Sequence, residues 1–342
     1  MAKRIGFHYF SDTLHYRESD LAAWLPELRA LGAEWLTLKA PADRAIPETF
    51  VRALLHAGIQ PVLHFHLPLG LSNRAESLNL LFEVYARWGV RYVVIFDRPN
   101  RRAAWPTAAW AQQDLVERFL DLYLPLAEAA LSAGLTPIFP PLEPGGDYWD
   151  TAFLRAALQG IQRRGHTALL ETLLIGAYGW ASNRPLDWGT GGPERWPAAR
   201  PYHTPAGEQD QRGWRIFDWY LTITQAVLGQ PRGILLLAAG SCPADQADPS
   251  RPAIDAAAHA QRNLTLARLM AGETVEGLEA VPAEVLACNF WLLAAAPHSP
   301  HRAQAWFQPE GNTLPAVGVL RQWAAQREHA APGAAQPPAL GQ

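Results

Sequence analysis

The chain has few cysteines, no run of basic residues and no long apolar segment. Two cysteines in 342 residues are too few for a disulfide framework and are typical of a reducing compartment. The formal net charge is −3 and Lys and Arg do not cluster, so nucleic-acid binding has no electrostatic basis. No window approaches the roughly 18 apolar residues of a membrane span. Residues 1–10 resemble a strand rather than a secretory signal. We therefore expect a cytoplasmic protein with no nucleic-acid or membrane partner.

Tryptophan, by contrast, is abundant, with 14 residues. Surplus tryptophan in loops suggests flat stacking surfaces, which suit the apolar C–H faces of sugar rings. The alternative is that these side chains pack loops onto the core, since large aromatic residues are usually mostly buried.

Strand-like and helix-like segments alternate along the chain. Apolar, β-branched runs predict strands at Arg4–Phe10, Trp35–Lys39, Pro61–His66, Tyr92–Phe96, Thr136–Pro140, Leu173–Tyr178, Gly233–Leu237 and Ala287–Leu293. Helices are predicted between them, among them Asp20–Leu31, Gln112–Ala133, Thr151–Arg164, Gln211–Leu228, Asp255–Met270 and Leu314–Glu328. Alternation of this kind indicates a parallel sheet with crossover helices. The repeats predict an α/β fold, a single (β/α)8 TIM barrel.

The barrel is predicted to span residues 1–329, and the Ala/Pro-rich tail over 330–342 is predicted to be disordered. A segment rich in Gly, Pro and Trp runs from Gly179 to about Asp210 after the sixth strand. Long loops in compact domains are usually functional or disordered. The aromatic residues and glycine turns of this one argue against disorder, so we expect it to fold over the barrel mouth.

The two cysteines are expected to remain unbonded. Cys242 follows the seventh predicted strand, whereas Cys288 lies near the start of the eighth. The length of strand between them exceeds the Cα separation of roughly 7 Å that a disulfide tolerates.

Several motifs follow the predicted strands in sequence order. The fourth strand stops at Asp97-Arg98-Pro99-Asn100, and the fifth leads into Pro140-Pro141-Leu142-Glu143-Pro144-Gly145-Gly146-Asp147-Tyr148-Trp149-Asp150. Later motifs are Ala177-Tyr178-Gly179, Asn289-Phe290-Trp291, Phe307-Gln308-Pro309-Glu310-Gly311 and Pro315-Ala316. Together this series resembles the (β/α)8-barrel glycoside hydrolases with two catalytic glutamates. The resemblance covers most of the chain and implies a carbohydrate ligand.

The sequence departs from that family at both catalytic positions. Arg98 stands where the family has its acid/base glutamate, and arginine does not transfer protons near neutral pH. The seventh strand ends in Ala238-Ala239-Gly240, without the nucleophilic glutamate. Retaining hydrolysis needs two carboxyl groups about 5–5.5 Å apart. The standard retaining mechanism is therefore predicted to be absent.

Other carboxyl groups are predicted on the same face. Asp97 ends the fourth strand, while Glu143 and Asp147 follow the fifth. Asp97 and Glu143 could form an inverting pair, which needs a separation of roughly 6.5–9.5 Å. The alternative is that Asp97 pairs with Arg98, with Lys39 or with loop amides. In either case we expect a carboxylate to orient Arg98 toward the cleft.

Histidines and a lysine end three of the early strands. His8 ends the first, and the alternation in His64-Phe65-His66 puts both histidines on one face. They could bind sugar hydroxyls or, if they converged with a carboxylate, a metal ion; we expect neither a metal nor another cofactor. Lys39 raises a Schiff-base aldolase as a further alternative, although that role needs a desolvated lysine, usually later in the barrel.

The leading hypothesis is a pseudo-glycosidase that binds a carbohydrate in a Trp-lined cleft. The competing hypotheses are an active glycosidase that uses Asp97 and Glu143, and a scaffold barrel without a ligand. The residues expected to bind the ligand are His8, Lys39, His64, His66, Arg98, Asn100, Asp147, Trp149, Tyr178, Trp180 and Trp291. The sequence leaves the sugar, its linkage and the oligomeric state open.

Overall fold

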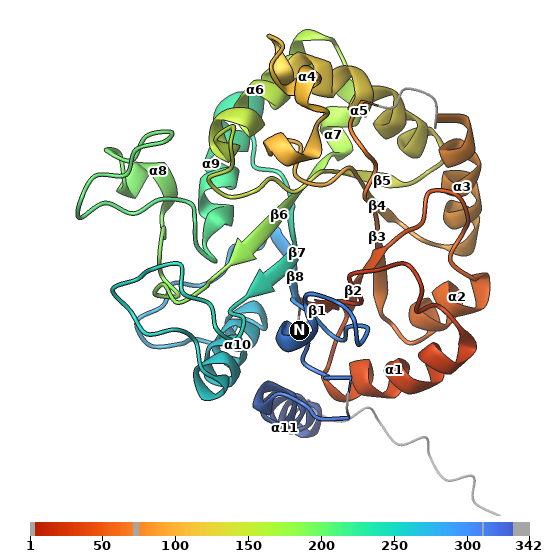
Figure 1. The fold of residues 1–342 in the computed structure, drawn as a ribbon, viewed down its shortest axis with the longest axis vertical. Helices are drawn as coiled ribbons and strands as arrows, with labels where there is room; N and C mark the ends of the chain where they lie inside the picture. The colour runs from red at the N-terminus through yellow and green to blue at the C-terminus, as the bar shows by residue number, and fades with distance from the viewer. Residues whose placement is uncertain (1–3, 71–74, 310, 331–342) are drawn as a thin grey trace, which may run out of the picture.

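The strands form a closed ring. A computed structural model describes residues 4–70, 75–309 and 311–330. The strands are β1 (Ile5–His8), β2 (Trp35–Lys39), β3 (Gln60–Phe65), β4 (Tyr92–Ile95), β5 (Thr136–Phe139), β6 (Leu174–Trp180), β7 (Ile234–Gly240) and β8 (Val285–Phe290). Each pairs in parallel with its neighbours in sequence, and β8 pairs with β1 (Figure 1). The predicted (β/α)8 barrel is confirmed.

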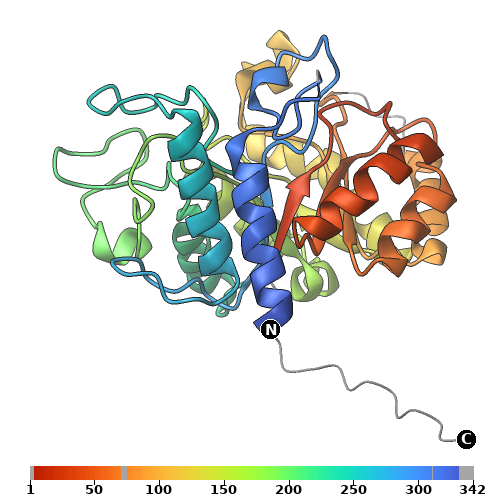
Figure 2. The same ribbon diagram turned by 90° about the horizontal axis from the view of Figure 1, so that it is seen from below.

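Helices surround this ring, as Figures 1 and 2 show from two directions. They are α1 (Glu18–Ala30), α2 (Glu48–His56), α3 (Ala75–Trp88), α4 (Thr107–Trp110), α5 (Leu115–Ser132), α6 (Asp150–Arg163), α7 (Thr167–Thr172), α8 (Gly192–Arg195), α9 (Ile216–Leu228), α10 (Ala256–Met270) and α11 (Pro315–Ala330), with 3-10 turns η1 (Arg102–Ala104) and η2 (Arg302–Gln304). In α5, Phe119 and Tyr123 lie one turn apart and both pack edge-on against Phe139 of β5.

Alternate strand residues build two separate cores. The barrel interior is filled by Val62, Val94, Ile138, Leu235, Leu237 and Ala287, with Tyr178 and Ala238 above them. Residues of opposite parity, such as Leu63 and Phe65 of β3, point outward and pack under the helices. The interior of a TIM barrel is thus a packed core, and a ligand can enter only at its end.

The main differences from the predicted boundaries are at β6 and β7. β7 continues three residues beyond its predicted end at Leu237, to Gly240, and β6 continues to Trp180. A bulge accompanies the extension, because Ala177 pairs with Leu236 but the next residue, Tyr178, pairs with Ala238. The extra residue is Leu237 of β7, so Leu237 and Ala238 both face the barrel interior, whereas Tyr178 and Trp180 follow the regular alternation of β6.

Other predictions have mixed outcomes. Both cysteines are free and buried, as expected. None of the helices in the described ranges combines the length and apolarity needed to cross a membrane. The predicted disordered tail falls outside the described residues, except that α11 extends to Ala330.

The loop after β6 does not cover the barrel mouth as predicted. Only its start reaches the mouth, and α8 lies beyond α9 on the outside of the ring (Figure 1). The amide of Gly191 donates to Asp218 of α9 at 3.0 Å, and Arg195 pairs with Glu279 at 2.7 Å. These contacts hold the middle of the loop against the helical layer.

The carboxyl of Asp150 at the start of α6 predicts a pH-dependent stability. It accepts hydrogen bonds from Gly145, Gln211 and Tyr220 at 2.6–3.0 Å. Burial raises the pKa of Asp150 from 3.8 to about 6. The native state therefore holds more protons than the unfolded state between these values, and this carboxyl lowers the free energy of unfolding as pH rises through that window.

Replacing Asp150 with Asn should remove this fall in the free energy of unfolding, which amounts to roughly 1–3 kcal/mol over the pH window. The amide is nearly isosteric, and the Tyr220 hydroxyl can accept where it now donates. Urea unfolding measured from about pH 4 to about pH 7 tests this. Exposed Asp43→Asn is the control and should keep the wild-type slope. Equal slopes for Asp150→Asn and wild type would refute the assignment.

Candidate functional site

A cavity of about 460 Å³ opens at the C-terminal ends of the strands. Ligand cavities usually occupy roughly 300–1,000 Å³, and TIM-barrel sites lie on this face. Seven of the expected ligand-binding residues line it: His8, Lys39, His66, Arg98, Tyr178, Trp180 and Trp291. The remaining lining residues were not predicted: Ser11, Ser182, Cys242, Asp245, His301 and Gln304. Most of these lie in loops beyond the strand ends, where a strand pattern carries no signal.

A left-handed turn after β4 aims Asp97 and Arg98 toward this cavity. Val94 points into the barrel, so simple alternation would point Phe96 inward and Asp97 outward. Phe96 instead has a φ of 76° and packs against Phe119 of α5. Arg98 also has a positive φ, 46°. Backbone conformations of this kind cost roughly 1–3 kcal/mol in residues other than glycine and cluster at functional sites.

Asp97, Arg98 and Glu143 form one ionic network. The Arg98 Nε donates to Asp97 Oδ2 at 2.9 Å, and Nη1 donates to Glu143 Oε2 at 3.3 Å. Burial alone would lower the pKa of Arg98, but the charges of Asp97 and Glu143 raise it above its ordinary value. The guanidinium also lies 5.6 Å from the centre of the Tyr178 ring. The expectation that a carboxylate orients Arg98 toward the cleft is confirmed.

This network occupies the carboxylates of the proposed inverting pair. Tyr178 donates to Asp97 Oδ1 at 2.5 Å while Arg98 takes Oδ2. Glu143 is shared between Arg98 and Arg101, the latter at 4.0 Å. A general acid must carry a proton it can give up, and a general base needs a free lone pair near the substrate. The arrangement gives Asp97 neither property.

Two histidines form a hydrogen-bonded chain beneath Asp97. The Phe96 carbonyl can only accept, so His64 Nε2 donates to it at 2.8 Å. His64 Nδ1 therefore accepts from His66 Nε2, 3.2 Å away. Burial lowers the pKa of both histidines, so both are neutral near pH 7. His64 thus supports the turn after β4 and does not line the cavity, whereas His66 does.

Within the described residues, His64, His66 and Asp97 are the group with the spacing to hold a metal ion. Their ligand atoms lie within 4.8 Å of one another, and neutral imidazoles with a carboxylate suit zinc. The surroundings oppose it, because both Asp97 oxygens already accept hydrogen bonds. Burial is the largest cause of the lowered pKa of His66, and His64 is the second. Lys39 and Arg98 also lie close enough to lower this pKa further. A divalent cation would face both positive charges.

Two tryptophans make a right-angled aromatic corner in the cavity wall. The rings of Trp180 and Trp291 are 6.0 Å apart at 89°. Tyr178 stacks on Trp180 at 5.5 Å, and the Trp291 indole nitrogen donates to Gln304 Oε1 at 2.9 Å. Both indoles are thereby held in fixed orientations. A sugar ring can stack on one face while the other bounds its edge.

The end of β7 offers no carboxylate at the position of the glycosidase nucleophile. Ala238 and Ala239 are buried there. The nearest acid in the cavity wall is Asp245, which accepts a hydrogen bond from the Cys242 amide at 2.9 Å. Burial raises the pKa of Asp245 above its ordinary value. It lies in the loop beyond Gly240, outside the motif that the sequence suggested.

Three expected ligand-binding residues have structural roles instead. Asn100 is fully buried and joins the two loops by bonding the backbones of Glu143 and Tyr148 at 2.8–2.9 Å. Asp147 accepts from the Arg102 amide at 2.8 Å. Trp149 is 6% exposed, and its backbone amide donates a hydrogen bond to the Tyr202 hydroxyl at 2.8 Å. The family-like motif after β5 therefore shapes the loop more than the cavity.

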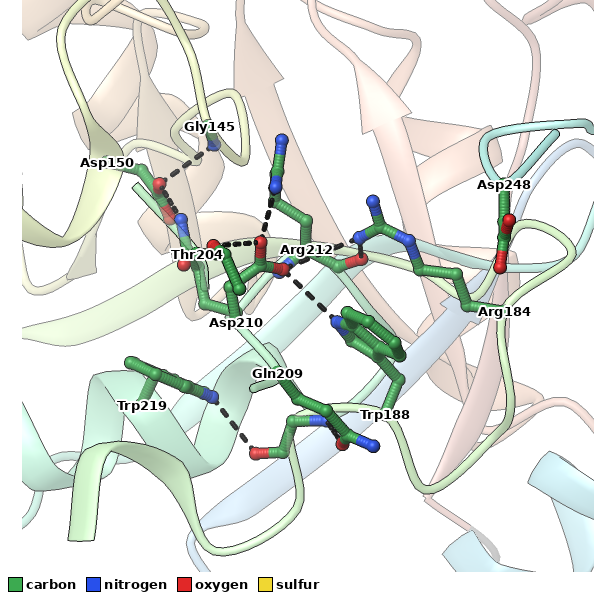
Figure 3. Close-up of polar contacts among 12 residues, drawn as sticks. Gly145, Asp150, Arg184, Trp188, Thr204, Gln209, Asp210, Arg212, Trp219 and Asp248 are labelled. Atoms are coloured by element: carbon green, nitrogen blue, oxygen red, sulfur yellow. Dashed lines mark hydrogen bonds and ion pairs between the residues drawn. The ribbon is translucent and has the colours of Figure 1, made fainter. Parts of the chain in front are cut away.

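The long loop after β6 is organised around the buried carboxylate of Asp210. Figure 3 shows Arg212, Trp188 and Thr204 converging on it, with the Trp188 indole at 3.1 Å and Thr204 at 2.9 Å. Burial would raise the pKa of Asp210, but the hydrogen bonds and charge of Arg212 outweigh it and lower the pKa. Arg184 approaches the same carboxylate at 3.5 Å. One residue thus ties both ends of the loop together.

The structure is similar to solved glycoside hydrolases at low sequence identity. A family 39 glycoside hydrolase from Bacteroides cellulosilyticus WH2 gives a TM-score of 0.55 at 11% identity, over 95% of this chain and 64% of that one. AbfB, a family 51 α-L-arabinofuranosidase from Bifidobacterium longum, gives 0.54 at 10% identity, over 94% and 73%. A β-galactosidase from the psychrophilic Marinomonas ef1 gives 0.55 at 9% identity, over 96% and 60%.

At these identities the similarity shows the fold, a TIM barrel that resembles glycoside hydrolase structures. The chain spans less than two thirds of the length of the family 39 enzyme and of the β-galactosidase. No model of a known protein family matches the sequence, and no curated protein sequence matches it.

Replacing Asp210 with Ala should destabilise the loop and the protein by about 3 kcal/mol, because it leaves the Arg212 and Trp188 donors without their acceptor. Thermal unfolding and limited proteolysis across residues 181–215 measure the effect. The control is Asp187→Ala, which removes an exposed carboxylate from the same loop. An Asp210→Ala protein as stable and as protease-resistant as the control would contradict the role of Asp210.

Proposed function

We propose that this chain binds a carbohydrate in the cavity at the barrel end and does not perform retaining glycoside hydrolysis. The support for binding is the corner formed by Trp180 and Trp291, which is bordered by polar side chains such as Lys39 and Gln304. Apolar rings beside a few polar groups are the usual make-up of a small-molecule site. The TIM-barrel resemblance to glycoside hydrolases is consistent with it.

One observation supports the proposal that the chain does not perform retaining hydrolysis. The side chain at the end of β4 is Arg98, bound to Asp97 and Glu143, and the end of β7 presents Ala238 and Ala239. Double displacement needs a carboxylate nucleophile and a proton donor on opposite sides of the scissile bond. Neither group stands at the position the mechanism requires.

The other hypotheses have less support. A ligand-free scaffold would have a filled mouth with buried aromatic side chains, whereas Trp180 and Trp291 line an open cavity. An inverting glycosidase would use Asp97 and Glu143, but Arg98 binds both carboxylates. That alternative requires a substrate to displace Arg98 before either carboxylate could act.

Replacing Trp180 or Trp291 with Ala should weaken glycan binding about 5- to 30-fold, which corresponds to roughly 1–2 kcal/mol of lost stacking. A glycan array identifies a bound oligosaccharide, and calorimetry with that oligosaccharide measures the loss. The matched control is Trp196→Ala, which removes a tryptophan at the end of α8 that does not line the cavity. If no glycan binds, or if the three variants lose affinity equally, the proposal fails.

Arg98→Glu alone should not produce retaining hydrolysis, because no nucleophile would stand at Ala238 or Ala239. Wild type and this variant are assayed with a broad panel of aryl glycosides, followed by product analysis. Both are expected to be inactive. Turnover by the wild type that is abolished by Asp97→Asn or Glu143→Gln would instead establish the relocated carboxylate pair.

A further inference from the structure

Lys39 places a positive charge in the cavity wall. It ends β2, and its ammonium donates to the Ser11 carbonyl at 3.0 Å. In the part of the chain that the structure describes, no ion pair joins it to a carboxylate. An ammonium has further N–H donors to offer. Lys3 and Lys39 are the only lysines in a chain whose other permanently charged cations are arginines.

His8 adds a second donor beside Lys39. Its ring is 2% exposed, and Nδ1 is buried without a hydrogen-bond partner. Burial, followed by the charges of His64 and Lys39, lowers the pKa of His8 to about 3, so the ring is neutral. A buried N–H without an acceptor is costly, which favours the tautomer with the proton on Nε2. That nitrogen is left to face the cavity, where a ligand can accept its hydrogen bond.

Arg98 completes a wall made of donors. Nε and Nη1 are taken by Asp97 and Glu143, while Nη2 has no partner among the described residues. The side chain is 35% exposed and lines the cavity. Its backbone is held in a left-handed conformation, with a φ of 46°. The ends of β1, β2 and β4 thus direct hydrogen-bond donors and positive charge at one side of the cavity.

The opposite side of the cavity has a different character. Asp245 follows β7, which lies across the ring from β3. One of its oxygens is occupied by the Cys242 amide. The aromatic corner of Trp180 and Trp291 comes from β6 and the end of β8, the strands on either side of β7. This arrangement favours a ligand whose acceptor groups point toward Lys39.

We propose that the bound carbohydrate is acidic, and that Lys39 and Arg98 hold the carboxylate of a hexuronic acid residue whose ring stacks in the Trp180–Trp291 corner. This inference rests on the proposed carbohydrate function and narrows it to a ligand class. Hydrogen bonds between charged groups are about twice as strong as neutral ones. The ligand's carboxylate would also supply a counter-charge to Lys39.

A carboxylate suits the wall better than a phosphate does. Arg98 already contacts two acids, Asp97 and Glu143, so Lys39 supplies the unpaired positive charge. A phosphate group carries a charge between about −1.5 and −2 and would be repelled by the same two acids. The single negative charge of a carboxylate matches the single positive charge of Lys39. A sulfated sugar also carries one negative charge per sulfate and serves as a comparison ligand.

The test is calorimetry on the full-length protein with oligomers of galacturonate, mannuronate, guluronate and glucuronate-bearing xylose. Each is compared with its carboxyl-reduced neutral counterpart, which keeps the same ring. At least one acidic oligosaccharide should bind about 10-fold or more tightly than its neutral counterpart. Lys39→Met should abolish that difference, measured as the ratio of the two affinities. The control is Arg44→Gln, which removes an exposed cation beyond the same strand.

A second readout places the contact at Lys39. In a Lys3→Arg background, reductive methylation with 13C-formaldehyde labels Lys39 and the N-terminal amine while the lysine keeps its charge. The dimethyl-lysine NMR signal should shift on addition of the bound uronate and remain unchanged with its carboxyl-reduced counterpart.

The outcomes separate this inference from the proposed function. Neutral oligosaccharides that bind as tightly as acidic ones would overturn the inference and leave carbohydrate binding standing. Uronates that bind with no shift of the Lys39 signal would overturn the assignment of the carboxylate to Lys39. If sulfated sugars bind and uronates do not, the proposal that the ligand's acidic group is a carboxylate is wrong. A panel in which nothing binds would overturn both proposals.

Discussion

Parallel pairing of β8 with β1 closes the sheet, and the whole site depends on that closure. A closed parallel ring has no free edge and gathers the C-terminal ends of all its strands around one opening. His8, Arg98 and Trp291 are far apart in sequence, yet each ends or follows a strand and reaches the same cavity. The packed barrel interior below them leaves the mouth as the one route into the ring for a ligand.

Charge balance then decides what this mouth can do. A guanidinium near an apolar core is costly unless it is paired. Arg98 obtains its pairing from Asp97 and Glu143, the same carboxylates that a hydrolytic mechanism would need to keep free. Arg98 therefore occupies both carboxylates at this end of the barrel. Among the described residues no carboxylate pairs with Lys39, and this difference gives the cavity its basic side.

Sequence reasoning succeeded where a local pattern has one structural solution. Repeated apolar runs separated by helical segments can form a parallel barrel, and the predicted strand ends placed His8 and Lys39 at its mouth. The pairing of Arg98 followed from the cost of an unpaired buried cation. Sequence reasoning was less reliable in loops. Asn100 and Asp147 follow the predicted strands as expected, but they form hydrogen bonds with neighbouring backbone groups instead of lining the cavity.

The sequence by itself determined the barrel, the strands that carry the site and the absence of glutamate at residues 98, 238 and 239, because these follow from residue type and period. Tertiary structure alone decided how the side chains at the mouth are used. The left-handed turn at Phe96 depends on packing against Phe119 of a later helix, and the bulge at Leu237 of β7 depends on the register of that strand with β6. Such contacts join residues distant in sequence, so no local pattern records them.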